Sequence, residues 1–215
     1  MIPDIYWDKR LAELKKTLER NNFEVYIAQS GDEATKIVNT KIIPETGAKT
    51  ILRGDSLTCL AAGVFEPVKQ NPELEYIEPF LEDLSFDETM ERLRKTLFSD
   101  IIITGSNAVT EKGQIVNLDM YGNRIGGITF GPKSVVILVG RNKIVTNLEE
   151  AMEKIRNRTA PANAIRLEYK TPCAVTSKCQ DCTSPERICN AWSILEKSFP
   201  KGKVKVILIN EDLGL

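Results

Sequence analysis

Four of the five cysteines lie in one short run, Cys173, Cys179, Cys182 and Cys189, with the spacing C-x5-C-x2-C-x6-C. Four thiolates complete a tetrahedral zinc site or hold a [4Fe–4S] cluster. The C-x2-C pair occurs in both kinds of site, but the full spacing matches neither the usual two-pair zinc pattern nor the bacterial ferredoxin run. The run therefore predicts a metal centre, with zinc and a [4Fe–4S] cluster both open. The alternatives are a thiol–disulfide redox role and cysteines that bind no metal.

The sequence contains no histidine. A general base, a metal ligand or a proton carrier must therefore come from Cys, Asp, Glu, Lys, Tyr or water. The fifth cysteine, Cys59, stands alone in a segment that is predicted to be helical, and we expect it to be a core residue. The chemistry of the chain should then depend on its clustered thiols, its carboxylates and its amines.

The composition is that of an ordinary globular protein. The 215 residues are 42% hydrophobic and 27% charged, with 29 basic and 30 acidic side chains. This near-neutral balance gives no electrostatic footprint for nucleic acid or an anionic membrane. No apolar run approaches the roughly 18–20 residues that span a bilayer, and the first residues lack the regions of a signal peptide. We therefore expect one domain over residues 1–215 and a cytoplasmic location, where free thiols persist.

Predicted helices and strands alternate along the chain. Residues 4–20 have apolar side chains at helical spacing and predict an amphipathic helix. Residues 101–105 and 134–140 are continuous apolar runs, which are typical of strands that are buried on both faces. The alternation predicts an α/β fold, a mostly parallel sheet with helices on both faces.

The cysteine-rich segment, residues 173–189, is predicted to lead into a helix. Ser184 and Pro185 are typical of a helix start, and Ile188, Trp192 and Leu195 would form its buried side. This places Cys182 just before the helix, where the positive end of the helix dipole stabilises a thiolate.

Three short polar loops directly follow predicted strands, at residues 54–56, 105–107 and 140–143. In open parallel sheets, ligands bind beyond the carboxyl ends of the strands. In the first loop, Gly54, Ser56 and Thr58 could hold a phosphate or a carboxylate through backbone N–H groups and hydroxyls. The alternative is a simple turn, with Asp55 or Ser56 capping the helix that follows.

The stretch between the two buried strands is rich in glycine, asparagine and charged side chains. Loops of this kind, held by rigid strands, often carry binding sites. Arg124 precedes a Gly-Gly pair, so the backbone could approach a ligand closely while the guanidinium pairs with an anion. The alternative is that these residues build turns and that Arg124 makes a surface salt bridge. From this stretch and the loop after it, the predicted ligand-binding residues are Gly105, Asn107, Thr110, Asn123, Arg124, Lys133, Asn142 and Lys143.

Several separated motifs occur in the order found in the LUD family, the lactate-utilisation domain, and the chain resembles that family over nearly its whole length. The motifs are GSNAVTEKGQIVNLDMYGNRIGGITFGPKSVVILVGRNKIV at residues 105–145, then AMEKIRNRTAPANAIRLE, TPCAVTSKCQDCTSPERICN and the terminal VKVILINEDLGL. The resemblance implies a fold of the NagB/RpiA/CoA-transferase-like type. That superfamily includes sugar-phosphate isomerases, CoA transferases and formyltetrahydrofolate cyclo-ligases, whose ligands are mostly anionic.

The resemblance also implies a functional setting. One type of member belongs with two iron–sulfur partner proteins, and together they oxidise L-lactate to pyruvate. The cysteine run is a feature of a subset that resembles this chain, not of the whole family. The isomerases of the superfamily carry acidic catalytic residues where this chain has Asn107, and an amide cannot act as a base. Isomerase activity by that mechanism is not expected, although Glu111 or Asp119 could substitute.

Two functions remain open from the sequence. The first is a redox-linked subunit in lactate or related organic-acid utilisation, which binds a small anionic ligand, holds a metal centre and acts with iron–sulfur partner proteins. The alternative is a stand-alone enzyme on CoA esters, sugar phosphates or folates. In that enzyme Arg124, Lys133 and Lys143 would bind phosphate, and Glu111 or Asp119 would transfer protons. The substrate, the direction of the reaction and a possible homo-oligomer are left open.

Overall fold

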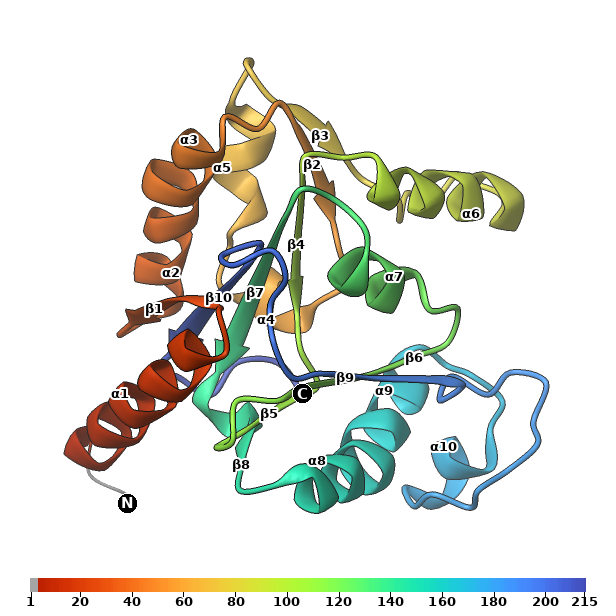
Figure 1. Cartoon of the computed structure of the whole chain (residues 1–215). Helices are drawn as coiled ribbons and strands as arrows, with labels where there is room; N and C mark the ends of the chain where they lie inside the picture. Colours follow the sequence, from red (N-terminus) through yellow and green to blue (C-terminus); the bar gives the residue numbers. More distant parts are fainter. Residues whose placement is uncertain (1–3) are drawn as a thin grey trace.

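The computed structural model describes residues 4–215, which form two β-sheets with helices around them (Figure 1). The larger sheet has six strands in the order β1-β10-β7-β4-β2-β3, and every neighbouring pair is parallel. These strands are β1 Glu24–Ala28, β2 Thr50–Arg53, β3 Glu75–Ile77, β4 Ile101–Gly105, β7 Ser134–Gly140 and β10 Val204–Ile209. The predicted α/β class with a mostly parallel sheet is confirmed.

Successive side chains of each inner strand point to opposite faces of the large sheet. Because these side chains are apolar, both faces are covered by helices. On one face, Ile101 and Ile103 of β4 pack in a core shared with α2, η1, α3, α4 and α5. On the other face, Ile102 shares a core with α7 and with Leu11 and Leu18 of α1. The helices of these layers are α1 Asp4–Arg20, α2 Gly31–Ile37, η1 Val38–Ile42, α3 Ile43–Thr46, α4 Leu57–Ala61, α5 Phe65–Gln70 and α7 Asn123–Thr129.

The smaller sheet lies beyond the carboxyl ends of β4 and β7, as Figure 1 shows. Its strand order is β8-β5-β6-β9, and β5 and β6 pair antiparallel as a hairpin. Ala108, Val116 and Val145 of this sheet share a small core with Ala151 of α8 and Ile155 of η4. The elements are β5 Ala108–Thr110, β6 Ile115–Asp119, η3 Arg141–Lys143, β8 Ile144–Val145, α8 Leu148–Lys154, η4 Ile155–Thr159, α9 Ala160–Arg166, α10 Pro172–Thr176 and β9 Ala191–Leu195.

One predicted element is wrong. No helix begins at Ser184. The chain is irregular from 177 to 190, and Ala191–Leu195 forms strand β9, which pairs antiparallel with β6. The spacing of Ile188, Trp192 and Leu195 fits a helical face, but the same segment can supply backbone hydrogen bonds to the edge of β6. The segment therefore forms a strand at the edge of β6. Since no helix begins at Ser184, Cys182 does not lie at a helix start.

The remaining elements lie at the edge of the fold. They are α6 Phe86–Arg94, which has a capping box at Ser85, and η2 Lys95–Leu97. In the part of the chain that the structure describes, no helix is both long enough and apolar enough to span a membrane. The prediction about a signal peptide falls partly on residues 1–3, which lie outside the described residues.

Candidate functional site

A cavity of about 380 Å³ lies at the carboxyl ends of β2, β4 and β7. These three strands are neighbours in the sheet, so the loops that follow them converge. Ser56 comes from the first loop, Asn107 from the second and Lys143 from the third, and all three line the cavity. The other walls come from α6, α7, α9 and the segment around Tyr169. The structure therefore brings together the three loops that the sequence placed at strand ends.

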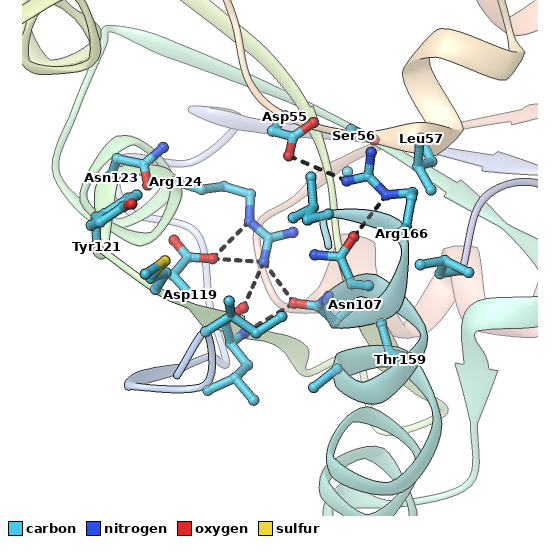
Figure 2. Close-up of a pocket in the computed structure, with 18 of the residues that line it drawn as sticks. Asp55, Ser56, Leu57, Asn107, Asp119, Tyr121, Asn123, Arg124, Thr159 and Arg166 are labelled. Carbon is cyan, nitrogen blue, oxygen red and sulfur yellow. Dashed lines mark hydrogen bonds and ion pairs between the residues drawn. The ribbon is translucent and has the colours of Figure 1, made fainter. Parts of the chain in front are cut away.

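Arg124 is the centre of a hydrogen-bond network in this cavity (Figure 2). Its Nε and Nη2 donate to Asp119 Oδ1 at 2.9 and 2.7 Å, and Nη2 also donates to Asn107 Oδ1 at 2.6 Å. The side chains of Arg124 and Asp119 are only 12% and 5% exposed, so the ion pair is buried. Nη1 makes no hydrogen bond within the described part of the chain. Arg124 therefore keeps one amino group for a ligand.

Asp119 serves mainly to position Arg124. Its Oδ1 accepts from the guanidinium, and its Oδ2 accepts the backbone N–H of Ile125 at 2.8 Å, in the first turn of α7. Both carboxylate oxygens of Asp119 are therefore occupied by neighbouring donors. This arrangement favours a structural anion over the proton-transfer role that the sequence suggested for Asp119.

Lys143 is a second cation of the cavity and is almost completely buried, with 5% of the residue exposed. Its Nζ donates to the backbone carbonyl of Ser106 at 3.0 Å. Burial, followed by repulsion from Arg124, lowers the pKa of Lys143 to about 7. The amine is therefore poised between its charged and neutral forms at neutral pH.

Arg166 of α9 is a third cation of the cavity, and sequence reasoning missed it. Its Nε donates to Asn163 Oδ1 at 3.0 Å, and its Nη2 lies 3.8 Å from Asp55 Oδ2 (Figure 2). Only the charge of the residue could have signalled it, because nothing in its helix distinguishes it from an ordinary surface arginine. The cavity therefore has three basic side chains in its lining, and the two acidic ones, Asp55 and Asp119, each lie beside an arginine.

One wall of the cavity is apolar and aromatic. Phe86 and Tyr121 pack edge to face with ring centroids 5.9 Å apart, although 62% and 48% of these residues remain exposed. The larger apolar and aromatic side chains on this wall are Phe80, Leu84, Phe86, Met90, Tyr121 and Tyr169. The cavity can therefore receive a ligand that joins an anionic group to an apolar or planar part.

Of the predicted ligand-binding residues, the structure places Ser56, Gly105, Asn107, Asn123, Arg124 and Lys143 on the cavity. Three others lie behind its wall. Thr58 donates to the Leu213 carbonyl, and the Asn142 amide accepts from the Leu213 N–H and donates to Gly214. Gly54 packs directly on Thr104, where a Cβ would lie 2.6 Å from the threonine side chain. These residues shape the cavity without lining it.

Three further predicted residues lie away from the cavity. Thr110 bonds to Gln114 within the β5–β6 turn. Glu111 pairs with Arg10 of α1 at 2.7 Å, so this candidate base has no contact with the cavity. Lys133 is 87% exposed and pairs with Asp100 at the amino end of β4, the opposite end of the sheet. Lys133 cannot share a ligand with Lys143.

The four clustered cysteines are all partly exposed and lie in α10 and the irregular segment after it. Cys173 contacts Thr171 Oγ1 at 3.2 Å, and Cys179 accepts the Asp181 N–H at 3.5 Å. Among residues 4–215, no three Cys, Asp or Glu side chains lie close enough to share a metal ion. The metal centre therefore stays a prediction from the spacing alone. Cys59 is buried, which raises the pKa of its thiol to about 12, as a core cysteine requires.

The fold and the site together define an α/β protein with a parallel sheet and a cationic cavity at its carboxyl edge. The family model of the LUD domain matches residues 11–209, and the chain belongs to the LUD-domain family, which is associated with lactate utilisation. Among solved structures, the chain is similar to a DUF162 family protein from Deinococcus radiodurans, with a TM-score of 0.53 and 14% identity. That match covers 98% of this chain and 100% of the other, and it supports the fold alone. No curated protein matches the chain.

Proposed function

We propose that this LUD-domain protein binds a small organic anion of lactate metabolism, a 2-hydroxy or 2-oxo carboxylate, in the cavity beside β2, β4 and β7. The observation that carries the proposal is the Arg124 guanidinium, which lines the cavity and whose Nη1 makes no hydrogen bond within residues 4–215. Arg166 and the Lys143 amine line the same cavity and add further hydrogen-bond donors. A carboxylate near Arg124 Nη1 would gain charge-assisted hydrogen bonds.

Replacing Arg166 with glutamine tests the proposal without disturbing the buried network. We expect the affinity for lactate or pyruvate, measured by titration calorimetry, to fall about tenfold, which corresponds to ~1.4 kcal/mol. Arg158→Gln is the matched control, because Arg158 is exposed and does not line the cavity. If the parent protein binds neither acid, or if both variants bind as the parent does, the proposal fails.

A larger ligand is the second candidate, and the apolar wall favours it. A cavity of about 380 Å³ with six apolar or aromatic side chains on one wall exceeds what a three-carbon acid fills. This supports the alternative of an enzyme on CoA esters, sugar phosphates or folates. Thermal unfolding with each compound discriminates, because a ligand of the folded state raises the melting temperature. Stabilisation by coenzyme A but not by pyruvate would replace the first candidate with the second.

We also propose that the protein is a redox-linked subunit, acting with iron–sulfur partner proteins, and the cysteine spacing supports this part. We expect anaerobically purified protein to contain zinc, or iron with acid-labile sulfide, and the Cys179→Ser, Cys182→Ser double variant to lose it. Iron with sulfide would support the redox role, and zinc would make the cysteines a structural clip. If the purified protein contains no metal, the redox-linked role is overturned. Anion binding is then still tested separately by calorimetry.

A further inference from the structure

Lys143 has an environment that anion binding alone does not require. A buried lysine is normally paired with a carboxylate, because an isolated charge is costly to desolvate. Lys143 takes part in no ion pair of the described residues, and its hydrogen bond goes to a backbone carbonyl, that of Ser106. Arg166, by contrast, is 36% exposed and lies beside Asp55. Lys143 and Arg166 are therefore chemically different, although both line the cavity.

The groups around Lys143 favour its neutral amine. Arg124 and Lys154 are cations that repel a charged Nζ, and the nearby Cys59 thiol is itself kept neutral by burial. Gly214 lies close to the amine and supplies no side chain. A neutral primary amine that is held in a cavity is a nucleophile towards carbonyl carbon.

We propose that Lys143 is a nucleophile that forms an imine with the carbonyl group of a 2-oxo acid bound in this cavity. The inference rests on the proposed function, since Arg124 or Arg166 must hold the carboxylate. The Nζ lone pair attacks the carbonyl carbon, and the former carbonyl oxygen gains a proton to give a carbinolamine. Loss of water then gives the imine, and hydrolysis returns the amine and the acid. No oxidant or reductant takes part in this cycle.

Reductive trapping with pyruvate tests the imine directly. Sodium cyanoborohydride reduces an imine to a stable secondary amine, and peptide mass mapping locates the added group. At pH 7 we expect Lys143 to be labelled at least about tenfold faster than any surface lysine, because a neutral amine is required and surface lysines are protonated. Lys143→Met should lose this label, Lys133→Met should keep it, and L-lactate, which has no carbonyl group, should give none.

Pyruvate affinity measured by calorimetry on the same protein separates the imine at Lys143 from the proposed binding of a small organic acid. Pyruvate binding without label on Lys143 would overturn the imine and leave the proposed function intact. Label spread equally over Lys133 and Lys143 would also overturn it, because it would show random surface reaction. If pyruvate does not bind and Lys143 is not labelled, both the imine and the proposed function are overturned. If Lys143→Met does not fold, the label map of the parent protein still decides.

Discussion

Replacing Arg124 with alanine should lower the free energy of unfolding by about 3–5 kcal/mol and abolish binding of small carboxylates. The variant leaves the Asp119 carboxylate buried, with only the Ile125 N–H as a donor, and it removes a donor from Asn107. An uncompensated buried charge costs much more than the lost ion pair is worth. Urea unfolding gives the stability, and calorimetry with pyruvate gives the binding.

A double variant, Arg124→Met with Asp119→Asn, is the control that separates the two effects. It removes both charges, so we expect it to regain a large part of the lost stability. Binding should stay lost, because the cation that faces the ligand is still missing. Arg158→Ala, at an exposed position, should unfold like the parent. Parent-like stability of Arg124→Ala would show that Asp119 is well solvated and that the buried network does not hold the site.

The position of the cavity could be predicted from the sequence, and the reason is topological. The runs at 101–105 and 134–140 are so uniformly apolar that only inner, parallel strands fit them. Sites in such sheets lie beyond the carboxyl ends of the strands, so Asn107 and Lys143 were found by the strand that each one follows. Lys133, which precedes its strand, belongs to the other end of the sheet for the same reason.

Other parts of the site depend on tertiary contacts that no local pattern contains. Arg166 lies on α9 and Phe86 lies on α6. Nothing in the sequence of these helices indicates that they pack beside the ends of β2, β4 and β7. The segment at 191–195 shows the same limit. Its apolar spacing suits a helix, and the free edge of β6 makes it a strand. Propensity is a weak prior where a sheet edge offers a full set of hydrogen bonds.

Replacing Lys143 with methionine should stabilise the protein, and the gain should depend on pH. The pKa of Lys143 is lowered to about 7 in the folded protein, against about 10.4 for an ordinary lysine in the unfolded chain. Between these values the unfolded chain binds more protons, so the unfolding free energy of the parent rises with pH. Below pH 7 the parent bears the full cost of burying the cation. There the variant should be more stable by roughly 3–5 kcal/mol, which is 1.4 kcal/mol per pKa unit.

Urea unfolding of both proteins at several values between pH 6 and 10 measures this difference. The advantage of Lys143→Met should shrink steadily from pH 7 towards pH 10, where the parent amine is neutral in the fold. Lys133→Met is the matched control, because Lys133 is exposed and lies away from the cavity. A constant difference between Lys143→Met and the parent across this range would mean that Lys143 stays charged in the folded state. The amine would then be an anion-binding cation only, and the nucleophile proposed at this position would have to be given up.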